Sequence, residues 1–372
     1  MKIATIADCH VGNHKNGILH GGPIKCGMNT RCRQVVTALE RAVAFCKEQE
    51  VDALVVAGDT FDTARPPPQM VEAVQRILDE VPSIVLVGNH DRWSDAPGDH
   101  ALGPLYPVAN VIEEPRSVVL GEWELVLVPY MPGNAKDWFE DAVDAVLKKD
   151  LEKQRLLFFH LGVEDEHTSS FLRGAHDSIH RDVVEELMEL HDITYAFAGN
   201  WHDHQHWPVL DGAGGIAQCG TLAPTGWDNE GDDGFGNVVL FDTEAKPPVT
   251  FHEIPGPRFL TVNGPRAIDT VIKHSRERGN DVFVQWRAPL ERLREAQEEI
   301  NEWVDAGLIV GGKAVIEDDQ RAEEAAREAA KVTRKAETLG EALAKFVEAM
   351  PLQDGVDRGD VLEKAQSYLG GA

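Results

Sequence analysis

Aspartate, asparagine and histidine side chains recur directly after short apolar runs in this sequence. The clearest example is Gly88-Asn89-His90-Asp91, which follows the β-branched run at residues 83–87. Such runs predict buried strands, and open α/β sheets bind their ligands at the carboxyl ends of strands. The same placement is shared by eight side chains: Asp8, His10, Asp59, Asn89, His90, His160, His202 and His204.

Carboxylates, an amide oxygen and imidazoles, with no thiolate among them, suit manganese, iron or zinc. The set is too large for a single ion, so we expect two ions about 3.5–4 Å apart that share one bridging carboxylate. Asp8 and Asp59 neutralise only part of the charge of two divalent ions. The centre would therefore stay positive with a hydroxide bound, attract a phosphate ester, and lower the pKa of bound water towards ~7.

Repeated strand–loop–helix units in the N-terminal part of the chain must position the first of these side chains. Strands are predicted at residues 3–7, 53–57 and 83–87, and helices at 31–50 and 69–80, from their apolar patterns. Strands that alternate with helices indicate a partly parallel sheet. The side chains at the carboxyl ends of its strands would then meet at one edge.

The following residues predict a second sheet packed on the first. Strands are expected on both sides of Gly121-Glu122, at residues 156–159 before His160, and at 194–198 before Gly199. Helices are expected at 137–149 and 182–191. Further short strands are expected near residues 207–210, 215–219, 237–242 and 249–254.

Pro255-Gly256-Pro257 marks a boundary in the sequence. We therefore expect three parts: a main domain at residues 1–257, a small α+β domain at 258–320 and a helical tail at 321–372. The small domain would include a helix at 290–305. The tail is rich in charged residues with a narrow apolar stripe, as expected of a segment that docks on a partner.

Composition limits the classes of protein that this chain can represent. The formal net charge is −27 over 372 residues, which argues against broad binding to phosphate backbones but leaves room for a local positive site. No apolar run reaches the roughly 18 residues of a membrane helix, and the first residues do not resemble a signal peptide. The five cysteines include no Cys-x-x-Cys pair, which favours free thiols in the reducing cytoplasm.

The motifs occur in an order that resembles the calcineurin-like metallophosphoesterases. They are Asp-x-His at residue 8, Gly-Asp-x-x-Asp at 58, Gly-Asn-His-Asp at 88, a lone histidine at 160 and a His-x-His pair at 202. The surroundings of Asp8 and Asp59, and Gly220-Thr221-Leu222 followed by Gly234-Phe235, resemble the SbcD-type nuclease subunit of a DNA double-strand-break repair complex. The resemblance implies an α/β fold with a two-sheet sandwich flanked by helices (α/β/β/α), a small α+β capping domain and a helical C-terminal tail.

The resemblance also implies a role for each motif residue. The implied ligands of the first metal are Asp8, His10 and His204. The implied ligands of the second metal are Asn89, His160 and His202. Asp59 would bridge the two, and His90 would orient the scissile phosphate or protonate the leaving oxygen instead of binding metal. Two manganese ions per chain are implied, with iron or zinc as alternatives, and Asp91 is expected to stabilise its turn.

The sequence departs from the family in its last motif, which is usually Gly-His-x-His. Here Trp201 precedes His202, and Gly199 lies two residues before the tryptophan. Trp201 could crowd the metal or stack on a base of the substrate. Arg31 and Arg92 lie in or beside loops near the metal edge and are candidate contacts to phosphate, although a solvated charge is an equally good interpretation for each.

These implications favour a metal-dependent DNA nuclease with 3′-to-5′ exonuclease action on duplex ends and endonuclease action on single strands. Gly311-Gly312-Lys313 is followed by Ala314 and does not form a P-loop, so any ATP-driven step needs a separate SbcC-type ATPase subunit. A homodimer through the helices at 31–50 and 69–80 is expected. Two alternatives stay open: hydrolysis of small phosphate esters or cyclic nucleotides, which the acidic charge favours, and a non-enzymatic scaffold with a degenerate site.

Overall fold

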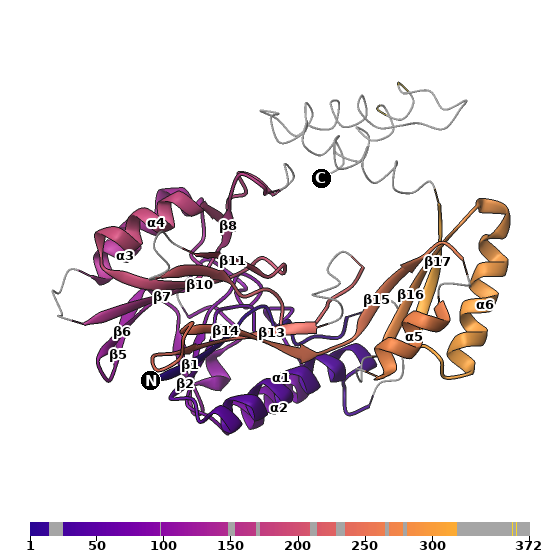
Figure 1. The fold of residues 1–372 in the computed structure, drawn as a ribbon, viewed down its shortest axis with the longest axis horizontal. Helices are drawn as coiled ribbons and strands as arrows, with labels where there is room; N and C mark the ends of the chain where they lie inside the picture. Colours follow the sequence, from indigo (N-terminus) through magenta and orange to yellow (C-terminus); the bar gives the residue numbers. More distant parts are fainter. Residues whose placement is uncertain are drawn as a thin grey trace.

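The computed structural model of the chain has two parts, a two-sheet sandwich and a small unit beside it (Figure 1). It describes residues 1–14, 25–96, 98–147, 153–168, 172–208, 214–227, 235–264, 268–277 and 281–317, together with residues 359 and 362. Helices cover both outer faces of the sandwich, which gives the α/β/β/α layers that the sequence predicts.

The first sheet carries the N-terminal strands. Its order is β14 (Val249–Pro255), β13 (Phe235–Asp242), β1 (Lys2–Ile6), β2 (Ala53–Val56), β3 (Ser83–Leu86) and β4 (Asn110–Ile112). β1 to β4 are parallel neighbours, whereas β13 and β14 run antiparallel. β2 and β3 are buried along their whole length, as expected of parallel strands covered on both faces. The crossover helices are α1 (Thr30–Gln49) and α2 (Pro68–Leu78).

The second sheet faces the first. Its order is β11 (Gln205–Pro208), β12 (Gly215–Gln218), β10 (Ile193–Gly199), β7 (Gln154–His160), β6 (Trp123–Val128) and β5 (Arg116–Leu120). The central strands β12, β10, β7 and β6 are parallel, and β5 and β6 form the hairpin that the Gly121 turn predicts. α3 (Phe139–Val146) and α4 (Arg181–Leu190) cover its outer face. Two short strands, β8 (Gly162–Glu164) and β9 (Ser178–His180), pair in parallel beside it.

Buried apolar side chains fill three layers of the sandwich. Between the sheets, the rings of Phe158 and Phe197 stack with centroids 5.0 Å apart. Outside the first sheet, α1 and α2 bury apolar faces that include Leu39. Outside the second sheet, Phe139 of α3 packs against Phe159 with ring centroids 5.0 Å apart. Burial of a side chain of this kind contributes roughly 1.5–3 kcal/mol, so these layers hold the site-bearing strands in place.

Residues 258–317, called the small unit below, have their own parallel sheet and apolar core. The sheet consists of β15 (Arg258–Val262), β16 (Val282–Ala288) and β17 (Gly311–Ile316). α5 (Ile268–Glu277) and α6 (Leu293–Asp305) connect these strands and pack against Val284 and Trp286. On the opposite face of the sheet, Phe259 and Phe283 stack with centroids 4.9 Å apart and contact the start of α1 through Arg31.

Most predicted elements are present, with shifted ends. The helix expected at 137–149 is a 3-10 turn (Ala135–Asp137) followed by α3, and residues 148–152 lie outside the described residues. The helix expected at 290–305 begins as a 3-10 turn and continues as α6. The domain boundary at residue 257 stays a prediction. The tail at 321–372 lies outside the described residues, apart from residues 359 and 362.

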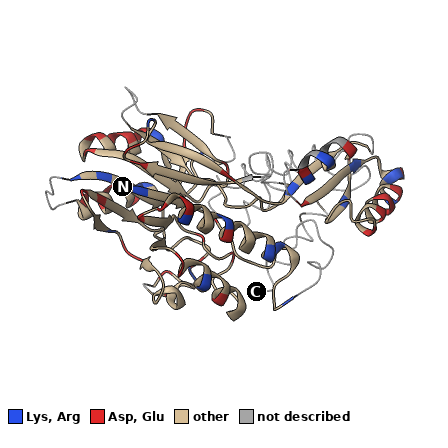
Figure 2. Cartoon of the chain, turned by 60° about the horizontal axis from the view of Figure 1, so that its bottom comes forward, with Lys and Arg blue, Asp and Glu red and all other residues tan. Residues whose placement is uncertain are grey.

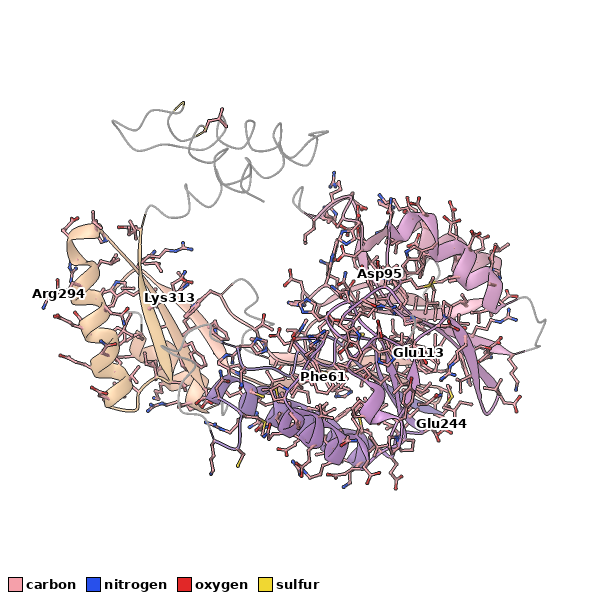
Figure 3. The ribbon with its side chains drawn as sticks, turned by 180° about the vertical axis from the view of Figure 1, so that it is seen from behind. Phe61, Asp95, Glu113, Glu244, Arg294 and Lys313 are labelled. Carbon is pink, nitrogen blue, oxygen red and sulfur yellow. The ribbon has the colours of Figure 1, made fainter. Side chains whose placement is uncertain are left out.

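The exposed helices carry both signs of charge close together (Figure 2). Arg76 of α2 pairs with Glu40 of α1 at 2.9 Å, and Arg294 pairs with Glu298 at 2.8 Å within α6. Figure 3 shows Arg294 on the outer side of α6, with Lys313 on the neighbouring sheet. Within the described ranges, none of the helices combines the length and the apolar character needed to cross a membrane.

Candidate metal centre

The carboxyl ends of five strands meet at one edge of the sandwich. β1, β2 and β3 are parallel neighbours in the first sheet, and β7 and β10 pair in the second sheet so that His160 lies opposite Gly199. The two sheets touch at this edge, because the backbone N–H of Asn200, after β10, donates to Asp8 Oδ2, after β1, at 3.0 Å. Side chains that follow these strands are therefore brought together.

The first group of metal donors comprises Asp8, His10 and His202. One ligand atom from each lies within 4.8 Å of those of the other two. The Nε2 atoms of His10 and His202 are 2.9 Å apart, and His10 Nε2 lies 3.9 Å from Asp8 Oδ1. Two imidazoles and a carboxylate at these separations can surround one divalent cation.

The second group is centred on His160 of β7. Its Nε2 lies 3.4 Å from Asp59 Oδ1 and 2.9 Å from Asn89 Oδ1. Its other ring nitrogen, Nδ1, is 2.7 Å from the carbonyl oxygen of Ala57. In the neutral ring, a proton on Nδ1 would be donated to that carbonyl and the Nε2 lone pair would face the centre, an arrangement typical of metal-binding histidines.

Asp59 lies between the two groups. Its Oδ2 is 3.7 Å from His10 Nε2, and its Oδ1 is 3.4 Å from His160 Nε2. The two oxygens of one carboxylate thus face different sets of donors, which is the geometry of a bridging ligand in a two-metal site. The donor types and their convergence fit two divalent cations.

Burial controls the protonation of these donors. It raises the pKa of Asp8 well above its usual value, and it lowers the pKa of His10 well below its usual value and that of His202 to about 4. Burial opposes a charge on His160, but the neighbouring Asp59 carboxylate raises the pKa of His160 to about 9. Burial also opposes a charge on Asp59, but His160 and His10 hold the pKa of Asp59 well below its usual value. His10 and His202 are therefore neutral at pH 7, as metal ligands must be.

Three of the donors lie on left-handed backbone. The φ angle is 51° at Asp8, 47° at His10 and 50° at Asp59. Such a conformation costs a residue other than glycine about 1–3 kcal/mol, and it persists where the surroundings enforce it. Here backbone hydrogen bonds do so, because His10 N donates to Asp59 O at 2.9 Å and Asp8 N donates to Gly58 O at 3.2 Å.

Asp91 links the loops that follow β2 and β3 by hydrogen bonds. Its buried carboxylate accepts hydrogen bonds from the backbone N–H groups of Phe61 and Gly88, each at 3.0 Å. Phe61, which is labelled in Figure 3, is buried in the apolar layer between the first sheet and helices α1 and α2. Burial raises the pKa of Asp91 to about 7, while these hydrogen bonds favour the ionised form. The expectation that Asp91 stabilises its turn is confirmed.

Two motif glycines are required by the side chains that cover them. A Cβ atom at Gly88 would lie 2.1 Å from Asp59 Oδ1, and one at Gly58 would lie 2.1 Å from His160 Nδ1. Gly58 also has a φ angle of 93°, which side chains other than glycine rarely tolerate. Each glycine therefore leaves room for a donor that arrives from another strand.

His90 lies on the exposed rim of the centre. Its backbone N–H donates to Asp59 Oδ1 at 2.9 Å, and its ring meets the ring of His10 edge-on with centroids 4.7 Å apart. Its Nδ1 lies 3.1 Å from the carbonyl oxygen of Asp62. The ring is thus held against the centre by Nδ1, which leaves Nε2 for a substrate.

The structure departs from the expected division of the two last histidines. His202 lies with Asp8 and His10, not with the second group. His204 does not belong to the donor groups found among the described residues, and its ring packs against Phe251 with centroids 4.4 Å apart. The cause is the turn after β10, in which Asn200 adopts a φ angle of 85° and directs His202 towards the first group.

The structure contradicts the expectation that Arg31 contacts a phosphate group. Its side chain is fully buried, and its guanidinium donates to Pro224 O at 2.8 Å and to Gln34 Oε1 at 2.8 Å. The guanidinium carbon also lies 4.7 Å from the ring centroid of Phe259 and 5.2 Å from that of Phe283. Arg31 therefore joins α1 to the small unit and does not face a substrate.

Arg92 and Trp201 are also engaged within the protein. The guanidinium of Arg92 donates to the carbonyl oxygens of Asp95 and Ala96, each at 3.2 Å. The indole of Trp201 lies on Gly162, where a Cβ atom would be 2.1 Å from Trp201 Cε2. Trp201 thus helps to set the turn that carries His202, and Arg92 shapes its own loop.

Asn200 is a residue at this edge that the sequence reasoning missed. It sits between Gly199 and Trp201, and its backbone and side chain contact both donor groups, as described below. A usable signal was present, because Gly199-Asn200-Trp201-His202 has the spacing of Gly-His-x-His with asparagine at its second position.

Comparison with protein families and curated proteins gives the following matches. A family model described as "Calcineurin-like phosphoesterase" matches residues 1–206. The chain is 20% identical over 187 residues to the SbcD component of nuclease SbcCD from Staphylococcus saprophyticus, over 46% of this chain and 45% of that protein. It is 29% identical over 97 residues to the protein of the same name from Bacillus subtilis, over 24% of this chain and 22% of that protein. The chain thus spans less than half the length of these relatives.

Two solved structures were also matched. The crystal structure of TT1561 of Thermus thermophilus gives a TM-score of 0.43 at 14% identity, over 68% of this chain and 98% of that chain. A dimetal phosphatase from Danio rerio gives a TM-score of 0.43 at 13% identity, over 68% of this chain and 99% of that chain.

Proposed function

Because this chain belongs to the calcineurin-like phosphoesterase family, we propose that it is a two-metal-dependent nuclease that hydrolyses phosphodiester bonds of DNA. The observation that carries the proposal is the position of Asp59, whose two oxygens face His10 and His160 at 3.7 and 3.4 Å. A carboxylate placed in this way can hold two cations against one phosphate group.

The residues that would hold the cations are those of the two donor groups: Asp8, His10, Asp59, Asn89, His160 and His202. When bound, two divalent cations lower the pKa of water and stabilise the charge that develops on the phosphate. The chain's contribution is to keep His10 and His202 neutral by burial and to keep Asp59 ionised. We propose manganese for both positions, with iron or zinc as alternatives.

His90 would act on the substrate. The Asp62 carbonyl and the Asp59 carboxylate fix its ring and its backbone, and the ring stands beside His10 on the exposed rim. In its protonated form the imidazole would orient the scissile phosphate or give a proton to the leaving oxygen. A phosphodiester needs such a donor, because an alkoxide is a poor leaving group.

DNA as the substrate is supported by the two curated relatives, both named as subunits of a nuclease. From the same resemblance we propose 3′-to-5′ exonuclease and single-strand endonuclease action in double-strand-break repair, in the cytoplasm, together with an SbcC-type ATPase. We propose further that two copies pair through α1 and α2, whose exposed sides carry charges of both signs.

Hydrolysis of small phosphodiesters or cyclic nucleotides is the second candidate. The observation in its favour is electrostatic. The net charge is −27, and two of the arginines nearest the centre in sequence, Arg31 and Arg92, are engaged by protein carbonyls. A small ester needs no extended basic surface, whereas DNA binding usually relies on many phosphate contacts.

Cleavage assays distinguish these two functions. The purified protein is tested with manganese, iron, zinc and magnesium on linear and circular DNA, with mapped product ends, and on a chromogenic phosphodiester and cyclic nucleotides. We expect DNA cleavage with manganese and products that shorten from the 3′ end. Turnover of the small esters without cleavage of either DNA would overturn the nuclease proposal and favour the second candidate. The His90→Asn variant serves as the control for a contaminating nuclease.

A further inference from the structure

Asn200 is anchored on both sides by hydrogen bonds. It follows β10 directly and has a left-handed backbone with a φ angle of 85°. Its backbone N–H donates to the two oxygens of Asp8 at 3.1 and 3.0 Å, and its side-chain Nδ2 donates to Asp177 O at 3.0 Å. Because the amide nitrogen is engaged with Asp177, the orientation of the Oδ1 atom is defined.

The Oδ1 atom of Asn200 points into the second donor group. It lies 3.3 Å from the amide atom of Asn89 that faces the centre. That same atom of Asn89 lies 3.1 Å from Asp59 Oδ2 and 2.9 Å from His160 Nε2. Four side chains from four different strand ends therefore present atoms to one point.

With the amide oxygen of Asn89 turned inward, all these atoms are hydrogen-bond acceptors. The Asp59 and Asn200 atoms are carboxylate and carbonyl oxygens, and His160 Nε2 carries a lone pair when Nδ1 donates its proton to Ala57. Acceptors at 2.9–3.3 Å repel one another unless a hydrogen-bond donor or a cation lies among them. Only a rotated Asn89 amide, a proton on His160 or a cation satisfies this cluster.

From this geometry we propose that Asn200 Oδ1 is a ligand of the second cation, together with Asp59, Asn89 and His160. His202 then belongs to the first cation, with Asp8, His10 and Asp59. This assignment rests on the two-metal centre proposed above, and it places each ligand of the last motif two residues earlier than expected, so that Asn200 and His202 occupy the two histidine positions of Gly-His-x-His. His204 has no place in it.

The assignment makes the two sites chemically unequal. The second site has three oxygen donors and a single imidazole, whereas the first has two carboxylates and two imidazoles. Oxygen donors favour magnesium and manganese, and imidazole favours zinc and iron. The second site therefore favours zinc over manganese less strongly than the first site does, and the first site binds zinc more tightly than the second does.

The experiment measures metal content and affinity in the full-length protein, independently of activity. Metal-free wild type, Asn200→Ala and Asn200→His are titrated separately with manganese and zinc, by calorimetry and by equilibrium dialysis with elemental analysis. We expect two manganese ions per wild-type chain. In Asn200→Ala one of the two sites should lose about 10–100-fold in affinity while the other, here called the weaker and the tighter site of that variant, is retained. In Asn200→His the weaker site should gain affinity for zinc relative to manganese.

His204→Ala is the matched control, because His204 lies two residues from His202 in the same turn. It should bind both ions as wild type does. Loss of an ion in His204→Ala, or unchanged affinities in Asn200→Ala, would overturn the assignment. If Asn200→Ala does not fold, the assignment is tested by the relative affinity of Asn200→His for zinc and manganese. An affinity ratio equal to that of wild type would overturn the assignment. Wild type that binds two ions but cleaves no phosphodiester would refute the proposed function and leave this assignment standing.

Discussion

Two buried polar clusters of this molecule contain hydrogen-bond acceptors that need a positive charge, and the two clusters obtain that charge in different ways. At the metal edge, Asp59 and His160 are buried with atoms that mostly accept hydrogen bonds. At the start of α1, Arg31 is equally buried but is a permanent cation, with the carbonyl oxygen of Pro224 and the faces of Phe259 and Phe283 around it. The first cluster needs cations from solution, and the second carries its own.

This difference indicates which of the two clusters can take part in a reaction. A guanidinium is fixed to the chain and remains charged at neutral pH, even though burial lowers the pKa of Arg31 to about 10. It can only hold α1 against the small unit. A cation from solution keeps coordination positions open for water and for a phosphate oxygen. The metal edge can therefore take part in a reaction, whereas the Arg31 cluster can only hold parts of the structure together.

The largest effect is expected from Asp59→Ala. Because the two oxygens of Asp59 face both donor groups, the variant should lose both cations and more than ~10³-fold in kcat/KM, which exceeds the usual loss for a single stabilising group. Elemental analysis and phosphodiester hydrolysis measure the two losses. Asp52→Ala, at an exposed carboxylate that accepts from Lys2 N, is the control and should change neither. Retention of either ion at normal affinity would contradict the bridging role.

The second largest effect is expected from His90→Asn, which tests whether His90 binds metal or acts on the substrate. The His90 side chain lies within reach of His10 and Asp62 on the exposed rim, but Asp59 accepts only its backbone N–H, so we expect His90→Asn to keep both cations. The loss of a proton donor should lower kcat by about 10²–10⁴-fold. Metal content and kcat are measured on the same preparation. A variant that loses metal together with activity would show that His90 is a ligand.

The metal edge could be predicted from the sequence because its residues directly follow apolar strands. Asp8, Asp59 and Asn89 come two or three positions after β1, β2 and β3, and parallel neighbours must bring these positions together. The strands and helices of the sandwich could be predicted for the same reason, since their apolar runs are long and regular. Their ends could not, because 3-10 turns such as Leu290–Arg292 have no clear sequence signal.

The place of His202 beside Asp8 and His10 has one sequence signal, the Gly-His-x-His spacing of residues 199–202, but that spacing alone does not predict the direction of the His202 side chain. That direction depends on a turn that is held by contacts from elsewhere in the fold. Gln218 of β12 donates to the carbonyl oxygens of Gly199 at 2.9 Å and Trp201 at 3.3 Å, and the indole of Trp201 lies on Gly162. Arg31 could not be predicted either, because Pro224, which accepts from it, lies 193 residues later in the chain.

A smaller effect, on the stability of the fold, is expected from replacing Arg31, the buried cation that belongs to the chain itself. Arg31→Met leaves the Pro224 carbonyl and Gln34 without their donor and removes a cation over two aromatic rings. The expected loss is about 2–4 kcal/mol in the free energy of unfolding, with metal content unchanged. Denaturant unfolding measures it. Lys47→Met, which breaks an exposed pair with Glu80 on the neighbouring helix end, should lower the free energy of unfolding much less than Arg31→Met does. A similar loss in both variants would show that burial of the charge is unimportant.

The smallest effect requires no substitution and concerns protons in the metal-free protein. The pKa of His160 is raised to about 9 by Asp59, and the pKa of His202 is lowered to about 4 by burial. His160 therefore stabilises the fold fully below its unfolded pKa of ~6.5 and loses this contribution as the pH rises through 9. His202 has the opposite sign, because its contribution is present above ~6.5 and is lost as the pH falls towards 4. These two groups alone should therefore lower the stability of the metal-free protein as the pH rises above ~6.5 towards 9 and as it falls below ~6.5 towards 4, which denaturant unfolding at several pH values measures.

Metal binding makes these protons measurable. A ligand must be deprotonated, so manganese bound at pH 7.5 should displace about one proton per chain from His160, and none from His202, which is already neutral. Calorimetric titrations in buffers of different ionisation enthalpy count the protons released, and NMR of the imidazole resonances identifies their source. Arg31 exchanges no proton in this range, so Arg31→Met should release the same number as wild type. The prediction is contradicted if no proton is released at pH 7.5 or if the proton comes from another histidine. In either case His160 is not protonated beside Asp59 in the metal-free protein, and a proton does not take the place of the cations at the metal edge.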